Sequence, residues 1–144
     1  MADDEQGIRD AMSRFATGID LRDWALYRSA FTDEITFDYT TYRPGSQGTV
    51  RADDWVERGR RRFEALDATQ HVLSSALVTA DGQSGTCSIQ VSAWHVVEID
   101  GRAEECTIVG RYLNDMQRVD DQWRIRVVRL QVRWISGNRA ILDL

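Results

Sequence analysis

Hydrophobic residues near the start of the chain recur every three or four positions, a period that predicts an amphipathic helix. The apolar positions are Ile8, Met12, Phe15, Ala16 and Ile19. Asp20 follows Ala16 by one helical turn and therefore lies near the same face. We expect this carboxylate to point toward the core or toward the rim of a cavity.

Two further helices are predicted, at about 23–31 and 52–66. The first places Trp24, Tyr27 and Phe31 on one side, and the apolar face of the second consists of Ala52, Trp55, Val56, Gly59, Phe63 and Leu66. Between these helices, residues 35–39 alternate like a strand, with Tyr39 on the same face as Ile35 and Phe37. Residues 43–48 include the only proline, and their composition predicts a turn-rich loop.

From Thr69 onward the pattern predicts strands only. The long segments are 71–79, 86–99, 104–119 and 123–135, and short turns separate them. Short connections indicate an antiparallel meander. The buried parity changes at Val127 and Val128, which predicts a β-bulge that curves the sheet. The fold class is therefore α+β: one domain over residues 1–144, with helices on one face of a curved, mostly antiparallel sheet and a conical cavity between them.

Strand parity directs one histidine inward. His95 shares a face with Cys87, Ile89, Val91, Ala93 and Val97. A lone histidine on an apolar face is either a hydrogen-bonded core residue or a catalyst. In the next strand Gly110, Tyr112 and Asn114 share a face. Gly110 either leaves room for a ligand or marks a bulge or tight packing.

His71 and Asp20 are the candidate acid–base pair. Both lie at the ends of predicted elements, a position that suits the mouth of a pocket. A carboxylate that orients an imidazole makes a general base. Position alone also allows a histidine bound to a neighbouring backbone group and an aspartate that caps a helix.

Composition narrows the classes of function. The net charge is −5, so the chain as a whole does not attract nucleic acid or anionic lipid. No apolar run approaches the roughly 20 residues of a membrane span, and the acidic N-terminus lacks a signal-peptide pattern. We expect a cytoplasmic protein.

The arginines at 58, 60, 61 and 62 are interpreted as a solvated helix face. The two cysteines lack the spacing of a metal site.

Several short motifs follow one another in a set order along the chain: Gly18-Ile19-Asp20, Arg22-Asp23-Trp24, Phe37-Asp38-Tyr39, Thr69-Gln70-His71, His95, Trp123-Arg124-Ile125 and Arg133-Trp134. Their order and spacing resemble the SnoaL-like group of the nuclear transport factor 2-like superfamily, and within it the scytalone dehydratase type. The resemblance spans about 6–138. The resemblance implies a cone-shaped α+β barrel with an internal active site, and enzymes of this group mostly use neither a metal nor an organic cofactor.

The resemblance also implies roles. Asp20 would orient His71, His71 would move the proton, Tyr39 would polarise a substrate carbonyl and His95 would steer or protonate a leaving oxygen. The chain has Ile19, Gly110 and Tyr112 where the dehydratase has tyrosine, serine and asparagine. We therefore expect a different substrate.

The resulting hypothesis is a cofactor-free lyase or isomerase acting on a small apolar cyclic ketone or polyketide-like molecule. Tyr27, Trp55, Tyr112 and Asn114 are the candidate substrate-binding residues. The alternatives are a binding module without chemistry and an accessory subunit of a larger enzyme. Five tryptophans exceed what one small core hides, which favours a homo-oligomer, and the family resemblance favours a trimer over a dimer.

Overall fold

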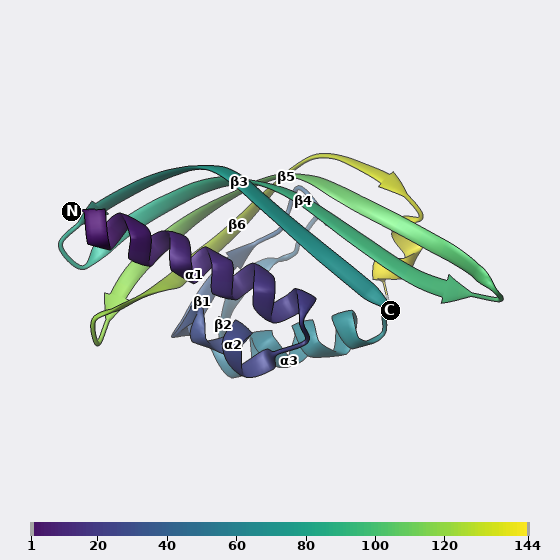
Figure 1. Ribbon diagram of the computed structural model, residues 1–144, viewed down its shortest axis with the longest axis horizontal. Coiled ribbons are helices and arrows are strands. Elements are labelled where there is room, and N and C mark those ends of the chain that lie inside the picture. Colours follow the sequence, from purple (N-terminus) through teal and green to yellow (C-terminus); the bar gives the residue numbers. More distant parts are fainter. Residues whose placement is uncertain (1, 144) are drawn as a thin grey trace.

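A computed structural model describes residues 2–143 and shows three helices packed against one curved sheet (Figure 1). The elements in chain order are α1 (Ala2–Asp20), α2 (Trp24–Ser29), β1 (Phe31–Asp38), β2 (Gln47–Arg51), α3 (Ala52–Glu64), β3 (Ala68–Asp81), β4 (Ser84–Ile99), β5 (Arg102–Val119), β6 (Gln122–Gly137) and the 3₁₀ helix η1 (Arg139–Leu142). The predicted α+β class is confirmed.

The sheet has six strands in the order β2-β1-β6-β5-β4-β3. Strands β3 to β6 form the predicted antiparallel meander, β2 is antiparallel to β1, and β1 runs parallel to β6. Within residues 2–143 the edge strands β2 and β3 do not pair with each other. The sheet is therefore curled but not closed.

Register shifts produce the curl. Asp115 pairs with Val127, whereas the next residue, Met116, pairs with Ile125, so Arg126 is an extra residue in β6. Such a bulge bends the strand and increases its twist. Val127 and Val128 are consequently both buried. The predicted bulge is confirmed, one residue before the parity change.

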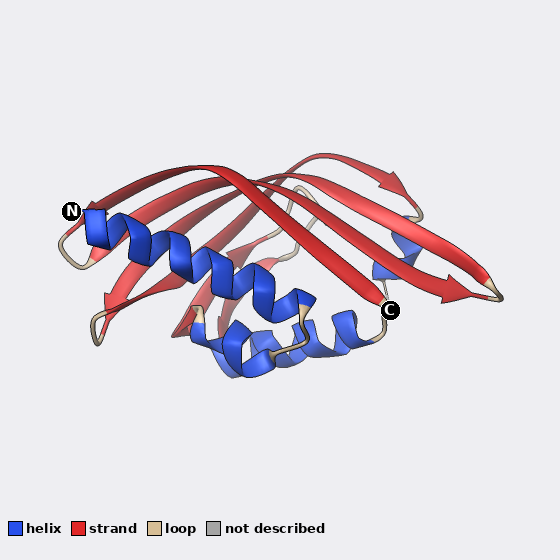
Figure 2. Ribbon diagram, in the orientation of Figure 1, coloured by secondary structure: helices blue, strands red, loops and turns tan. Residues whose placement is uncertain are grey.

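All three helices lie on the concave side of the sheet (Figures 1 and 2). The apolar stripe of α1 that the sequence predicts is fully or almost fully buried against the sheet and the other helices. Among the described helices, none is long and apolar enough to cross a membrane.

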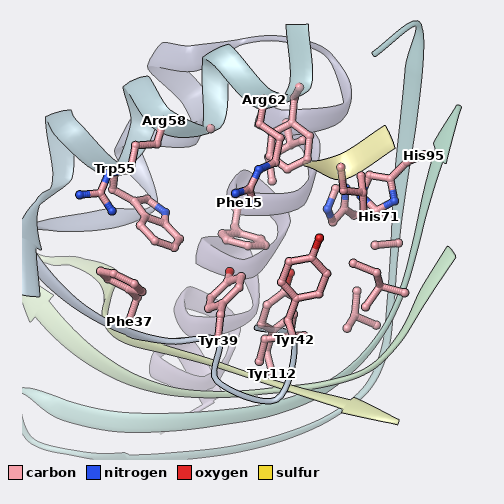
Figure 3. A pocket seen from close by; sticks show the side chains of 18 of the residues that line it. Phe15, Phe37, Tyr39, Tyr42, Trp55, Arg58, Arg62, His71, His95 and Tyr112 are labelled. Carbon is pink, nitrogen blue, oxygen red and sulfur yellow. The ribbon is translucent and has the colours of Figure 1, made fainter. Parts of the chain in front are cut away.

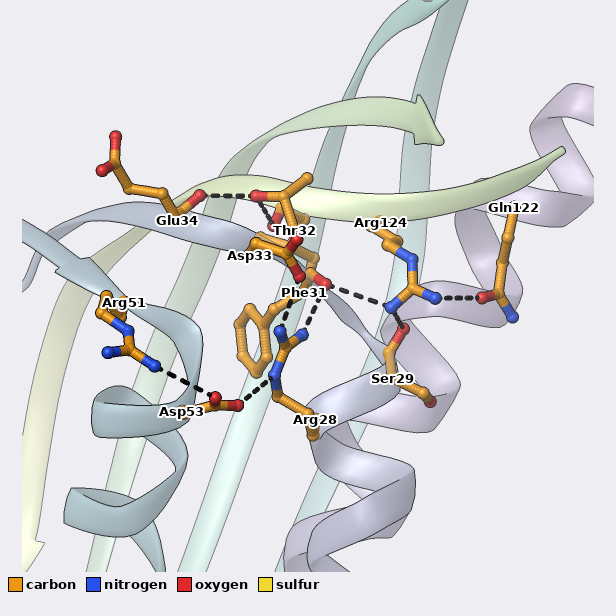
Figure 4. Close-up of polar contacts among 11 residues, drawn as sticks. Arg28, Ser29, Phe31, Thr32, Asp33, Glu34, Arg51, Asp53, Gln122 and Arg124 are labelled. Atoms are coloured by element: carbon orange, nitrogen blue, oxygen red, sulfur yellow. Dashed lines mark hydrogen bonds and ion pairs between the residues drawn. The ribbon is translucent and has the colours of Figure 1, made fainter. Parts of the chain in front are cut away.

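Arginine side chains connect the α2–β1 junction to its neighbours (Figure 4). Arg28 donates to Asp33 and to Asp53 at 2.8 Å each, which links α2 to β1 and α3. Arg124 of β6 donates to the carbonyl oxygens of Ser29, at 3.0 Å, and Phe31, at 3.2 Å. These contacts satisfy backbone acceptors where α2 ends and fix α3 over the cavity.

Some local predictions were wrong. The second helix ends at Ser29, and Phe31 already belongs to β1. The loop predicted at 43–48 is shorter, because Gln47 starts β2. Gly110 leaves no room for a ligand: it lies at a register shift, and a Cβ there would collide with the carbonyl oxygen of Gln131. The alternative reading, a bulge with tight packing, is the correct one.

Candidate active site

A cavity of about 140 Å³ lies between α3 and the concave face of the sheet (Figure 3). Aromatic side chains from α1, α2, β1, α3, β5 and the turn after β1 form much of its wall. They include Phe15, Tyr27, Phe37, Tyr39, Tyr42, Trp55, Phe63 and Tyr112, and both histidines of the chain also line it. A cavity with an apolar wall and few polar groups is typical of a small-molecule site.

The predicted pair of Asp20 and His71 exists. The Nδ1 atom of His71 lies 2.8 Å from Oδ1 of Asp20, and the side chains are 3% and 21% exposed. The backbone N–H of His71 donates to Oδ2 of the same carboxylate at 2.7 Å. Asp20 stands behind His71 and outside the cavity lining, whereas the imidazole reaches the cavity.

Two further residues hold the carboxylate in place. The Thr69 hydroxyl donates to Oδ1 of Asp20 at 3.0 Å and accepts from Arg22 at 2.8 Å. Arg22 also donates to the carbonyl oxygen of Ile19, at the end of α1. Burial alone would raise the pKa of Asp20, but hydrogen bonds from His71 and Thr69 outweigh burial and hold the pKa below its usual value. Asp20 is therefore a carboxylate at neutral pH.

The second imidazole, His95, lies next to the first, with 5.9 Å between the ring centroids. It is 4% exposed, and its Nδ1 lies 2.9 Å from the carbonyl oxygen of Cys106. A carbonyl can only accept, so Nδ1 carries the proton and donates. Burial lowers the pKa of His95 to about 4. At neutral pH it is a neutral ring whose Nε2 is a hydrogen-bond acceptor.

Three tyrosines contribute hydroxyl groups to the polar surface of the cavity. Tyr39 follows the end of β1, Tyr112 lies on β5, and Tyr27 lies on α2 and accepts a hydrogen bond from Trp55 at 3.1 Å. Burial raises the pKa of all three phenols. They remain protonated at neutral pH and are available as hydrogen-bond donors.

Most of the predicted site residues meet at this cavity. Those that line it are Tyr27, Tyr39, Trp55, His71, His95 and Tyr112. Asn114 does not: it is 1% exposed in the core, where its amide donates to the Met12 sulfur at 3.3 Å and accepts from the backbone N–H of Arg129 at 3.2 Å. Its parity was predicted correctly, but the helix α1 covers that end of the strand.

Several polar residues of the cavity wall were missed. Arg62 was assigned to a solvated helix face, yet it is half-buried and lines the cavity together with Arg58. The spacing of Trp55, Arg58 and Arg62 along α3 could have shown this, since the three positions share one side of a helix. Tyr42 lies in a turn after β1 and gave no periodic signal.

The structure has no group of three or more His, Cys, Asp or Glu side chains that could hold a metal, as far as residues 2–143 are concerned. Cys87 and Cys106 are free and buried. Burial raises the pKa of the Cys87 thiol to about 11. Both cysteines therefore act as small core residues.

The sequence profile of the SnoaL-like domain family matches residues 1–129, and the chain belongs to this family. No curated protein matches the sequence with significance. The Kfla4162 protein from Kribbella flavida has a similar crystal structure, with 27% identity, complete coverage of both chains and a TM-score of 0.90.

Two more distant structures share the fold. A candidate scytalone dehydratase from Novosphingobium aromaticivorans is 16% identical over 96% of this chain and 93% of its own, with a TM-score of 0.82. A type 2 hexachlorocyclohexane dehydrochlorinase is 14% identical over 95% of this chain and 90% of its own, with a TM-score of 0.78. At this level of identity the similarity establishes the fold.

Proposed function

We propose that the protein is a cofactor-free lyase or isomerase that removes a proton next to the carbonyl group of a small, mostly apolar cyclic ketone or polyketide-like substrate. One observation carries the proposal. A histidine held by a carboxylate presents its free ring nitrogen to a cavity with aromatic walls. An oriented imidazole beside an apolar substrate is suited to general base catalysis.

His71 is the base in this mechanism. Because Asp20 accepts the proton on Nδ1, the lone pair lies on Nε2, on the cavity side (Figure 3). Nε2 takes the proton from the substrate carbon, and the electron pair of the broken C–H bond moves to the carbonyl oxygen and forms an enolate. Asp20 stabilises the imidazolium that results without accepting its proton.

The tyrosines stabilise the enolate. Tyr39 and Tyr112 keep their protons because burial raises the pKa of each, and both can donate to the enolate oxygen. His95 accepts a hydrogen bond from a hydroxyl group of the substrate and orients it. Its low pKa makes it unsuited to protonate a leaving group, a role that falls to the His71 imidazolium.

Two outcomes follow from the enolate. If the β-carbon carries a hydroxyl group, the carbonyl re-forms, the C–O bond breaks, and the proton on His71 leaves with the hydroxide as water. Otherwise His71 returns the proton to another carbon, which is an isomerisation. The similarity in fold to a candidate scytalone dehydratase and to a dehydrochlorinase supports elimination.

Proton exchange tests the proposal without knowledge of the natural substrate. We expect the protein to catalyse exchange of the α-protons of cyclic ketones such as 2-tetralone in D₂O, followed by ¹H NMR. General base catalysis contributes roughly 10²–10⁴-fold, and His71→Gln should lose that factor. Arg61→Gln, on the outer side of α3, is the control and should keep the wild-type rate. A loss below about threefold in His71→Gln would contradict the proposal.

A second candidate function, binding without chemistry, has one observation in its favour. Asp20 also accepts from the backbone N–H of His71, so the carboxylate joins the end of α1 to β3 as a structural contact would. In that case His71→Gln would lower the free energy of unfolding, and ketone exchange would be undetectable in the wild type. A non-catalytic subunit of a larger enzyme would show the same result and would purify with its partner.

We also propose that the protein forms a homo-oligomer, with a trimer favoured. Trp94 and Trp134 are 60% and 55% exposed, and Val72 is 45% exposed. All three lie on the outer face of the sheet, opposite the cavity. Exposed tryptophans on one sheet face are typical of an interface. Light scattering after size-exclusion chromatography should give a mass of three chains, and a monomer would contradict this.

A further inference from the structure

The four arginines of α3 form two pairs, which lie on different sides of the helix. Arg60 and Arg61 point away from the cavity and bind Glu57, at 2.6 Å and 3.2 Å. Arg58 and Arg62 instead line the cavity (Figure 3). None of the carboxylates in residues 2–143 lies within ion-pair distance of either one. The inner pair therefore carries positive charge that the described chain does not neutralise.

The cavity as a whole is cationic, although the protein has a net charge of −5. Its charged lining residues are Arg43, Arg58 and Arg62, and no Asp or Glu of the described chain is among the lining. Arg43 is paired with Asp143. The charge of Arg62 acts on two of the cavity tyrosines: burial raises the pKa of Tyr27 and of Tyr39, and the Arg62 charge opposes that rise in both.

Tyr42 adds an unpaired donor to the same wall. The side chain is 5% exposed, and its hydroxyl oxygen is buried without a hydrogen-bond partner in the part of the chain that the structure describes. Figure 3 shows this hydroxyl directed into the cavity. The Arg139 guanidinium lies 4.5 Å from the Tyr42 ring centroid and holds the ring in position. A buried hydroxyl without a partner is unfavourable, so a ligand oxygen that accepts from it is favoured.

We propose that Arg62 and the Tyr42 hydroxyl form a carboxylate subsite, and that the substrate is an aromatic or alicyclic acid. The carboxylate accepts from Tyr42 and pairs with Arg62, and the ring lies against the aromatic wall. Arg58, at the exposed end, attracts the anion into the cavity. The reaction part of this inference rests on the proposed function, because the acid must also present its C–H bond to His71, but the binding part does not depend on it.

The fork of a guanidinium fits a carboxylate, and a hydrogen bond between charged groups is stronger than one between neutral groups. Calorimetry with benzoate and 2-naphthoate, each compared with its neutral amide, measures the contribution of the charge. In the wild type we expect at least one acid to bind about tenfold more tightly than its amide, which corresponds to about 1.4 kcal/mol. Arg62→Gln should lose this preference and keep the affinity for the amide.

Arg61→Gln is the matched control, since it removes the same charge from the same helix on the side that faces solvent. It should keep the preference for the acid. Tyr42→Phe removes the second donor without a change in charge. It should weaken binding of the acid more than binding of the amide, because a hydrogen bond to a charged acceptor is the stronger one. Equal affinity for acid and amide in the wild type, an undetectable affinity for both, or a preference that survives Arg62→Gln would overturn the subsite.

The experiments distinguish a failure of the carboxylate subsite from a failure of the proposed general base. If His71→Gln binds the acids as the wild type does while Arg62→Gln does not, the subsite stands, whatever the result of the proton-exchange assay. If ketone exchange depends on His71 but acids show no preference that depends on Arg62, the general base stands and the carboxylate subsite is wrong.

Discussion

Both oxygens of the Asp20 carboxylate bind the same residue, His71: Oδ1 lies 2.8 Å from the ring Nδ1, and Oδ2 lies 2.7 Å from the backbone nitrogen. The backbone contact fixes the start of the side chain, and the ring contact fixes its rotation. One aspartate at the end of α1 thus sets the position, the orientation and the tautomer of one histidine on β3.

The first prediction concerns this tautomer. Neutral His71 should carry its proton on Nδ1, because a carboxylate can only accept. In Asp20→Asn an amide nitrogen can donate to Nδ1, and the population should shift toward the Nε2–H form. Two-dimensional ¹H–¹⁵N NMR of the imidazoles separates the two tautomers.

His95 is an internal control for that experiment, since its Nδ1–H donates to the Cys106 carbonyl in both proteins. Its ring should remain in the Nδ1–H tautomer. An unaltered His71 spectrum in Asp20→Asn would show that the carboxylate does not select the tautomer.

The second prediction concerns Thr69. Thr69→Val removes the hydrogen bond to Asp20 and leaves one partner of Arg22 missing. We expect a loss of about 1–3 kcal/mol in the free energy of unfolding. Thr79→Val is the matched control on the same strand, because the Thr79 hydroxyl is exposed and pairs with another exposed hydroxyl, that of Thr86.

Urea denaturation of both variants gives the comparison. Thr79→Val should remain within about 0.5 kcal/mol of the wild type, as surface substitutions usually do. Equal losses in the two variants would mean that Thr69 contributes no more than an exposed strand hydroxyl.

The third prediction concerns acid stability. The pKa of His95 is lowered from 6.5 to about 4 by burial. The unfolded chain therefore binds a proton as the pH falls below about 6.5, whereas the folded chain does not until about 4, and folding stability is lost between these values. This effect amounts to at most about 3 kcal/mol.

Glutamine at position 95 does not titrate and keeps an N–H donor. The free energy of unfolding of His95→Gln should thus fall less than that of the wild type between pH 7 and pH 4, measured by denaturant titration at a series of pH values. Parallel pH profiles for the two proteins would show that His95 has an ordinary pKa.

The fourth prediction separates Asn114 from the site. Asn114→Ala leaves the backbone N–H of Arg129 without its acceptor. We expect a loss of about 1–3 kcal/mol in stability with no change in the affinity for benzoate or its amide, because Asn114 lies outside the cavity. Weaker binding with unchanged stability would show that Asn114 takes part in ligand binding after all.

The sequence predicted the fold largely because its periodicities are long and regular. The buried stripe of α1 and the inward parity of His95 follow directly from spacing. The prediction of buried and exposed positions from strand alternation failed where the strand backbone is irregular. Counting from His71 would place Leu77 inside, but a register shift beside Ser75, which has a positive φ of 56°, leaves Leu77 71% exposed.

The site was only partly predictable. The Asp20–His71 contact joins two elements that are distant in sequence, and it was expected from the family resemblance as well as from position. Composition alone did not separate Arg62 from Arg60 and Arg61. The side of α3 that Arg62 shares with Trp55 and Arg58 by helical spacing could have done so. Tyr42 lies in a turn, where hydrophobic spacing carries no information.

The central claim is that Asp20 and His71 act as one catalytic unit. A double-variant cycle of Asp20→Asn and His71→Gln, measured by ketone α-proton exchange in D₂O, tests it most directly. Residues that act as a unit give strongly non-additive losses. We predict that the double variant is no slower than His71→Gln alone. If the two losses multiply in the double variant, the residues act independently and the claim is wrong.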